Sequence, residues 1–88
     1  MVTASTIEVT VRYFAAARAA AGVETETVSV ASGATVTDLL ATLRTRGQRL
    51  ATVLDRCSFL CDGVAVRDVR KPLETNQTVD VLPPFAGG

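Results

Sequence analysis

The alternation of apolar and polar residues between Ile7 and Tyr13 is the sequence feature that most restricts the fold. Successive side chains of a β-strand point to opposite faces, so an alternating segment is typical of a strand with one buried face. The apolar positions are Ile7, Val9, Val11 and Tyr13, and the polar ones between them are Glu8, Thr10 and Arg12. The sequence therefore predicts a half-buried strand near the start of the chain.

Two further strands are indicated by β-branched residues next to turn signals. Residues 24–30 are rich in Thr and Val and precede a Ser32-Gly33 break, so we expect a strand there. The last strand is predicted at residues 78–82, where Val79 and Val81 share one face.

A hairpin is predicted between these strands. Residues 57–61 and 64–66 are mainly apolar and flank Asp62-Gly63. Asp-Gly favours a type I′ turn, because that turn needs a positive φ at both central positions. We therefore expect two more strands, joined directly.

One main helix is predicted after residue 35. Thr35 and Asp38 have the spacing of a capping box, and Gly47 is expected to end the helix. A second short helical segment is predicted at residues 48–56. The apolar stripe of the main helix has the i, i+3, i+4, i+7 spacing and consists of Val36, Leu39, Leu40 and Leu43.

The predicted order is β-β-α-β-β-β, which fits an α+β fold in which a mixed sheet of about five strands packs on one main helix. This is the order of the β-grasp, or ubiquitin-like, fold, although an open sandwich of another topology has a similar order. The alanine-rich residues 14–21 are interpreted as a connector with a short helical turn that Gly22 stops. The 88 residues make one domain, with a flexible N-terminus at residues 1–5 and a protruding tail at residues 83–88.

Composition excludes several function classes. Nine basic and nine acidic residues cancel, so the positive field typical of nucleic-acid-binding proteins is missing. Histidine is absent, which removes the commonest general base and metal ligand, and we expect no metal site and no bound cofactor. No segment is apolar enough to span a membrane, and no signal peptide is visible.

Cys57 and Cys61 are too few for a disulfide framework and too far apart along one strand to bridge each other. A reduced, cytoplasmic compartment is the expectation. No electropositive group stands near them in the sequence, so we interpret both as buried small apolar residues, not as reactive thiols.

The last six residues, Pro83-Pro84-Phe85-Ala86-Gly87-Gly88, distinguish this chain from a generic small domain. The two prolines end the last strand, because neither donates a ladder hydrogen bond, and their fixed φ favours an extended direction. Gly87 and Gly88 have no side chain and fit a narrow channel. The alternative is an inert, frayed terminus. If the tail is functional, its chemistry lies at the α-carboxylate, which is ionised at neutral pH and needs activation by another enzyme.

With this tail the chain resembles the MoaD/ThiS family of sulfur-carrier proteins, and within it the MoaD branch, over residues 7–88. The similarity rests on the following segments: Val11-Arg12-Tyr13-Phe14-Ala15, Thr35-Val36-Thr37-Asp38-Leu39-Leu40, Pro72-Leu73 and Leu82-Pro83-Pro84-Phe85-Ala86-Gly87-Gly88.

The resemblance implies a small subunit of molybdopterin synthase that has no active site of its own. Gly88 would be adenylated by a ubiquitin-activating-enzyme-like adenylyltransferase that uses ATP, and a sulfur donor would convert it to a thiocarboxylate. Pro84, Phe85, Ala86 and Gly87 would thread into a MoaE-like large subunit, where the sulfur passes to precursor Z. The alternatives are a carrier for thiamine or cysteine synthesis, a ubiquitin-like protein modifier, and an interaction module with an inert tail.

Side-chain parity predicts a partner interface beside the tail. If Val11 and Val81 face the helix, Phe14 and Leu82 point to the opposite face of the sheet. The first and last strands are parallel neighbours in a β-grasp sheet, so Phe14 and Leu82 are expected to lie together at the root of the tail. It is equally possible that the alanine-rich connector covers them. Arg12 and Arg67 are interpreted as solvated side chains.

Overall fold

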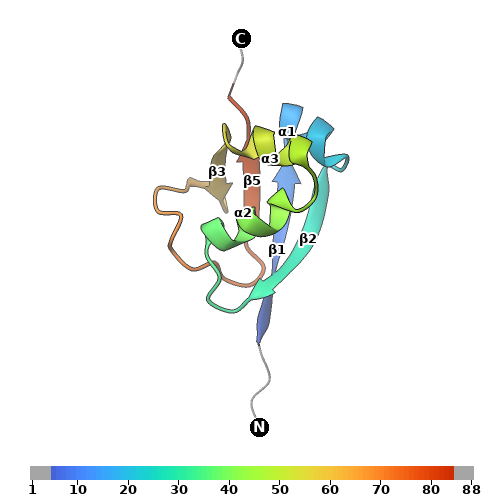
Figure 1. Cartoon of the computed structure of the whole chain (residues 1–88). Coiled ribbons are helices and arrows are strands. Elements are labelled where there is room, and N and C mark those ends of the chain that lie inside the picture. Colours follow the sequence, from blue (N-terminus) through green and yellow to red (C-terminus); the bar gives the residue numbers. More distant parts are fainter. Residues whose placement is uncertain (1–4, 85–88) are drawn as a thin grey trace.

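A computed structural model describes residues 5–84 and arranges them as a mixed five-stranded sheet with helices on one face (Figure 1). The strands are β1 (Thr6–Tyr13), β2 (Thr25–Ala31), β3 (Ser58–Cys61), β4 (Val64–Ala65) and β5 (Thr78–Leu82). The helices are α1 (Ala15–Ala21), α2 (Val36–Arg44) and α3 (Gln48–Leu54). The β-grasp prediction is confirmed. None of these helices has the length and apolarity needed to cross a membrane.

The first and last strands lie side by side in the middle of the sheet, whose order is β2-β1-β5-β3-β4. β1 runs antiparallel to β2 and parallel to β5, and β5 runs antiparallel to β3. Because β1 and β5 are parallel, both end at the same edge of the sheet. That edge lies toward α1 and α3 in Figure 1.

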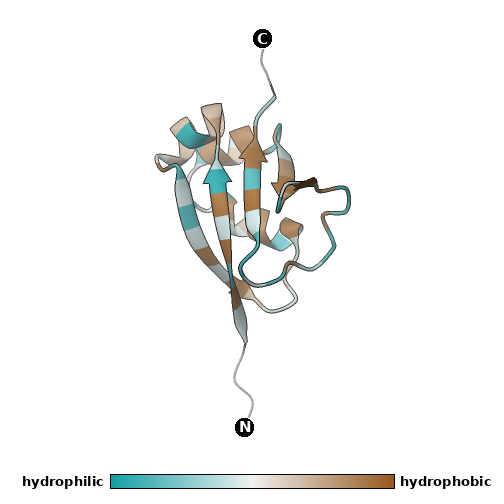
Figure 2. Cartoon of the chain, turned by 180° about the vertical axis from the view of Figure 1, so that it is seen from behind, coloured by the Kyte–Doolittle hydropathy of each residue, from teal (hydrophilic) through white to brown (hydrophobic). Residues whose placement is uncertain are grey.

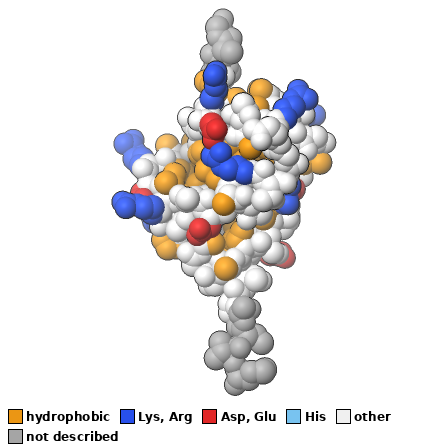
Figure 3. All heavy atoms as spheres, in the orientation of Figure 1, with side chains coloured by type: hydrophobic (Ala, Val, Ile, Leu, Met, Phe, Trp, Pro, Cys, Tyr) orange, Lys and Arg blue, Asp and Glu red, His pale blue; other side chains and the backbone are white. Residues whose placement is uncertain are grey.

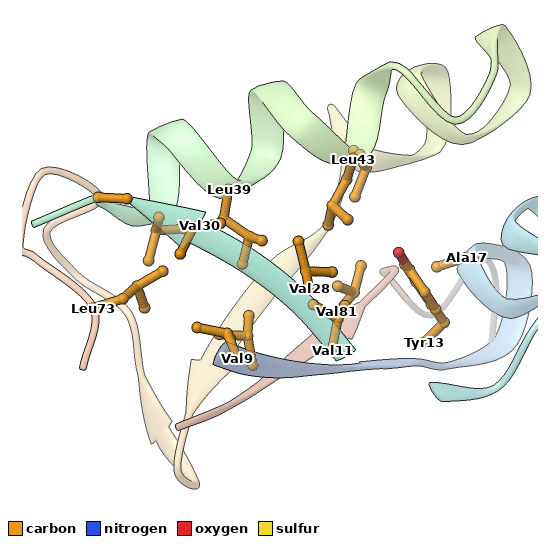
Figure 4. Close-up of a cluster of buried hydrophobic side chains, with 14 of the residues drawn as sticks. Val9, Val11, Tyr13, Ala17, Val28, Val30, Leu39, Leu43, Leu73 and Val81 are labelled. Atoms are coloured by element: carbon orange, nitrogen blue, oxygen red, sulfur yellow. The ribbon is translucent and has the colours of Figure 1, made fainter. Parts of the chain in front are cut away.

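The core fills the space between the sheet and α2, as Figure 4 shows. Val9, Val11 and Tyr13 of β1 are at most 1% exposed, as the alternation in the sequence predicts. Leu39 and Leu43 of α2 are fully buried against them, whereas Leu40 lies at the margin of the core. The remaining buried apolar residues are Ala17, Val28, Val30, Ala34, Val36, Leu50, Leu54, Leu73, Val79 and Val81.

Local signals in the sequence fix most element ends. Thr35 and Asp38 form the predicted capping box at the start of α2. Asp62 (φ 49°) and Gly63 (φ 83°) have the positive φ angles of the predicted hairpin turn. The prediction for Gly47 was wrong: α2 ends at Arg44 with Thr45 as its C-cap, and Gly47 (φ 152°) instead precedes α3 as its N-cap. Hydrogen bonds of the amides of Thr45 and Arg46 to the carbonyls of Thr42 and Leu43 close α2 before Gly47 is reached.

The alanine-rich segment forms a true helix, and Gly22 (φ 80°) ends it as predicted. Its first residue, Ala15, has a φ of 50°, a left-handed conformation that costs a residue with a side chain roughly 1–2 kcal/mol. This conformation turns the chain from the end of β1 into the helical layer, where α1 packs on α3. The preceding residue, Phe14, stays extended.

The two cysteines lie at the margin of the core. Cys57 directly precedes β3 and Cys61 ends it, and both are half-buried rather than fully buried as predicted. The Cys57 thiol donates a hydrogen bond to the Val53 carbonyl, 3.2 Å away. Burial raises the pKa of both thiols, and at Cys61 the charge of Asp62 raises it further. Both are therefore protonated, weakly nucleophilic thiols at neutral pH.

Ala15→Gly is expected to stabilise the protein by about 0.5–1 kcal/mol, because relief of the left-handed strain exceeds the added entropy of the unfolded chain. Ala16→Gly, one residue further along α1, is the matched control and should destabilise by up to about 1 kcal/mol. Urea unfolding of both variants measures the two free energies of unfolding. Equal destabilisation by both would show that Ala15 is not strained.

Alkylation by iodoacetamide is expected to be slower at both cysteines than at a free cysteine in a short peptide at neutral pH. The raised pKa leaves less thiolate at that pH, and the difference should shrink as the pH rises above the ordinary thiol pKa. Intact-mass time courses at several pH values measure the rates. The urea-unfolded chain is the control, and it should react as the peptide does.

Candidate functional site

The candidate site is the uncovered face of the sheet at the end where β1 and β5 stop. Figure 2 looks onto this face, where hydrophobic and hydrophilic bands alternate along the strands. Register places Arg12 opposite Asp80 and Thr10 opposite Thr78, all on this face, as parity predicts. Val11 and Val79, opposite each other, point into the core.

An ion pair joins the two central strands on this face. Arg12 Nε lies 2.6 Å from Asp80 Oδ1, and a second guanidinium nitrogen lies 2.9 Å from Asp80 Oδ2. The Asp80 side chain is only 9% exposed, whereas that of Arg12 is 49% exposed. The hydrogen bond and charge of Asp80 raise the pKa of Arg12, so the guanidinium is permanently charged. Two parallel hydrogen bonds fix the plane of this side chain.

Apolar side chains surround the ion pair. The Arg12 guanidinium carbon lies 5.4 Å from the centroid of the Phe14 ring, a cation–π contact. Phe14 is 37% exposed, and its amide donates to the Val81 carbonyl, which holds it against the end of β5. Leu60 of β3 pairs with Asp80 and therefore shares its face. We call Phe14, Leu60 and Leu82, with the Arg12–Asp80 pair between them, the outer patch.

α1 does not cover the outer patch, which settles the alternative that the sequence left open. The helix packs on α3, on the opposite side of the sheet, and Phe14 remains exposed. Leu82 and Leu60 are half-buried, so each keeps part of its apolar surface accessible. The predicted neighbours Phe14 and Leu82 thus lie at the same end of adjacent strands.

The root of the tail adjoins this patch. β5 ends at Leu82, whose strand partner is Ser58, and Pro83 and Pro84 follow without strand pairing. Pro83 is half-buried and Pro84 is exposed. The predicted tail residues Phe85, Ala86, Gly87 and Gly88 lie outside the described residues, as do residues 1–4 of the predicted N-terminal segment.

The end of β1 is also fixed from the core side. The Tyr13 hydroxyl donates to Glu26, 2.5 Å away, and Glu26 in turn pairs with Arg46 at 3.0 Å. Burial and this hydrogen bond raise the pKa of Tyr13, so its hydroxyl stays protonated and keeps donating. The end of β1, which positions Phe14, is therefore held by side-chain hydrogen bonds on both faces of the sheet.

The chemistry of these residues is that of binding. Within residues 5–84, no three His, Cys, Asp or Glu side chains gather in a way that suits a metal ion. The outer patch offers apolar surface and one half-exposed guanidinium, and the remaining polar group, the Asp80 carboxylate, is nearly buried and bonded to that guanidinium through both oxygens. This face of the protein suits recognition of a partner.

The sequence places Phe14 and Leu82 on this face, as the structure does, but does not indicate Leu60 or the ion pair between Arg12 and Asp80. Arg12 was read as a solvated side chain, and Asp80 received no partner. The parity of β1 and β5 placed both charges on one face, which was the available signal. Leu60 needed the register between β3 and β5, and the sequence alone does not set this register.

Comparison with known proteins identifies the family of this chain and a relative that matches most of its length. The model of the ThiS family matches residues 11–88. A molybdopterin synthase sulfur carrier subunit from Chlamydomonas reinhardtii is 34% identical over 83 residues, which cover 93% of this chain and 100% of that protein.

Solved structures agree with the fold. The HVO 2177 protein of Haloferax volcanii is 32% identical, with a TM-score of 0.82 over 94% of this chain and 88% of that chain. A putative molybdopterin converting factor subunit 1 from Pyrococcus furiosus is 28% identical, with a TM-score of 0.81 and coverage of 90% and 99%. The small archaeal modifier protein 1 of Methanosarcina acetivorans is 26% identical, with a TM-score of 0.80 and coverage of 96% and 99%. Because the family model spans most of the chain and the relative is matched over its full length, the chain belongs to the ThiS family, within the MoaD/ThiS group that its sequence resembles.

Proposed function

We propose that this protein is a sulfur carrier that acts as the small subunit of a molybdopterin synthase. The full-length match to a molybdopterin synthase sulfur carrier subunit carries this proposal, together with the terminal Pro83-Pro84-Phe85-Ala86-Gly87-Gly88 sequence. The apolar outer patch at the root of that tail supports it, since a carrier without an active site must dock on the enzymes that act on its terminus.

The proposed chemistry takes place at the carboxyl group of Gly88. A carboxylate oxygen attacks the α-phosphorus of ATP, pyrophosphate leaves, and an acyl-adenylate forms on a ubiquitin-activating-enzyme-like adenylyltransferase. Hydrosulfide from a sulfur donor then attacks the acyl carbon, a proton is released, AMP leaves, and a thiocarboxylate remains. Activation is needed because the free carboxylate, ionised at neutral pH, is a poor acylating agent.

In the second half of the cycle the loaded tail enters a MoaE-like large subunit. Pro84, Phe85, Ala86 and Gly87 are the residues that would thread into its channel, and the thiocarboxylate sulfur would pass to precursor Z. Phe14, Leu60 and Leu82 would contact the partner around the channel mouth. Their half-exposed apolar surface next to Pro83 supports this arrangement.

A second candidate function is that of a protein modifier, in which Gly88 is joined to lysines of other proteins. The likeness to the small archaeal modifier protein 1 favours it. Both functions begin with the same adenylate and differ only in the nucleophile that attacks it. The products therefore distinguish them.

Incubation with ATP, a sulfide source and the activating enzyme is expected to raise the intact mass by the difference between one sulfur and one oxygen atom. Deletion of Gly88 should abolish this gain, because the carboxylate moves back by one residue and the terminal Gly-Gly is lost. The same deletion should change the free energy of unfolding by less than about 0.5 kcal/mol. Intact mass spectrometry and urea unfolding measure the two effects.

Other products of the same reaction contradict the proposal. Conjugates of higher mass, joined to lysines, would favour the modifier. If the mass stays unchanged with every candidate activating enzyme, the remaining interpretation is an interaction module with an inert tail.

Phe14→Ala, Leu60→Ala and Leu82→Ala are each expected to weaken binding to the MoaE-like subunit about tenfold, since truncation of an apolar anchor at an interface costs about 1–2 kcal/mol. Calorimetric titration measures the affinity. Val69→Ala is the matched control, because Val69 is an exposed apolar residue, 40% accessible, in the loop between β4 and β5. Equal affinities for all four variants would remove the outer patch from the interface.

A further inference from the structure

The free edge of β2 carries unpaired backbone groups. The Tyr13 amide donates to the Glu24 carbonyl and the Ser32 amide to the Ser5 carbonyl, which fixes the direction of every peptide group between them. With this register, Glu26, Val28 and Val30 bond to β1. Thr25, Thr27 and Ser29 therefore direct their amides and carbonyls away from the sheet, and no hydrogen bond within residues 5–84 uses these groups.

β2 has only one of the features that usually protect an edge strand, the inward-facing charge of Glu26, and Tyr13 and Arg46 engage that carboxylate. The sequence of β2, Thr-Glu-Thr-Val-Ser-Val-Ala, contains no Lys or Pro, and its register with β1 is continuous from Thr25 to Ala31, without a bulge. Figure 1 shows β2 as the outermost strand, and only the turn that leads from α1 into its first residues lies further out. The side chains of Thr25, Thr27 and Ser29 are also exposed. A further strand therefore has access to this edge.

A hollow beside β2 also leaves space near this edge. A shallow hollow of about 500 Å³ lies between the second half of β2, the turn that follows it and α2. Ser29, Ala31, Ala34 and Thr42 are among the residues that line it. At the other end of β2, Val23 is 46% exposed and has no place in the core.

We infer that β2 pairs with the β2 of a second copy of this chain, antiparallel and centred on Thr27, to form one continuous sheet. In this register Thr25 of one copy faces Ser29 of the other, and the two Thr27 residues face each other. All the outward amides and carbonyls of these three residues then find partners. The same register places the exposed Val23 opposite Ala31.

The chemistry of β2 favours a second copy of the chain. On the uncovered face, Thr faces Thr or Ser, and such cross-strand hydroxyl pairs are stabilising. On the other face, Glu26 is opposite Val28 and Glu24 is opposite Val30, so no like charges meet. The chain also has a formal net charge of zero, and basic and acidic side chains both occur on the face that Figure 3 shows, so two copies do not repel each other.

This dimer goes beyond the proposed function and is compatible with it. The outer patch and Pro83 lie at the end of β5, which β1 separates from β2. Antiparallel pairing directs the ends of the two β5 strands to opposite ends of the dimer. Both carriers would thus remain available to their partners.

Sedimentation of the full chain tests the inference. We expect a reversible dimer with a Kd of about 0.1 mM, weak because one strand pair buries little area. Thr27→Lys should weaken the dimer about fivefold or more, since two like charges then face each other. Thr27→Pro should weaken it about tenfold, because each copy loses the hydrogen bond that its outward amide donates.

Charge complementation tests the register. Thr27→Lys and Thr27→Glu should each be weakened alone, and their equimolar mixture should dimerise at least as well as the wild type, because residue 27 faces itself only in the proposed pairing. Thr10→Lys is the matched control on the neighbouring strand of the same face, and it should leave the dimer intact. Circular dichroism and sulfur loading of each variant separate loss of folding or function from loss of pairing.

A wild-type chain that stays monomeric up to about 1 mM would overturn the inference and would leave the edge to an extended segment of another protein. A dimer that survives Thr27→Pro unchanged would also overturn it, because the contact would then lie elsewhere. Absence of recovery in the mixture of the Lys and Glu variants would reject the register centred on Thr27.

Discussion

The parallel pairing of β1 with β5 is the constraint on which the rest of the structure depends. It joins residues far apart in the chain and places both strands at the centre of the sheet, with Val11 and Val79 fully buried against α2. Because the strands are parallel, they end together. The exposed Phe14 at the end of β1 therefore lies beside Leu82 and Pro83, and the same contact that forms the core places an apolar surface at the root of the tail.

The Arg12–Asp80 pair explains how this pairing keeps its register. Asp80 is almost fully buried, and burial of a carboxylate costs free energy that its two hydrogen bonds to Arg12 offset. We therefore expect the pair to add little net stability. A shift of β5 by one residue, however, would turn Asp80 toward α2 and Val79 toward solvent. The charge of Asp80 thus excludes the shifted pairing. Because the register of β5 is fixed, the place where the tail leaves the sheet is fixed as well.

Local chemistry explains which features could be predicted from the sequence. The alternation of β1, the Thr35–Asp38 capping box and the Asp62-Gly63 turn each depend on a few neighbouring residues, and each element formed as expected. Gly47 was assigned wrongly, because α2 closes earlier through backbone bonds near Thr45, a competition that the sequence does not reveal. Leu60 joined the candidate site through the pairing of β3 with β5, a contact between distant segments, so only the fold could place it there.

Strand pairing also explains why the tail begins where it does. The register of β3 with β5 ends at Ser58 and Leu82, and Pro83 and Pro84 have no amide to extend it. An amide at position 84 would point toward the chain that precedes Ser58, and one at position 83 would point toward the end of β1, so donors there would favour further pairing along the sheet. The fixed φ of two prolines also removes conformational freedom before any partner is met, so less entropy is lost when a tail that starts there enters a channel. The residues that stop the sheet thus also restrict the chain that follows them, and in the proposed cycle the cleavage of ATP would supply the free energy for the chemistry at its end.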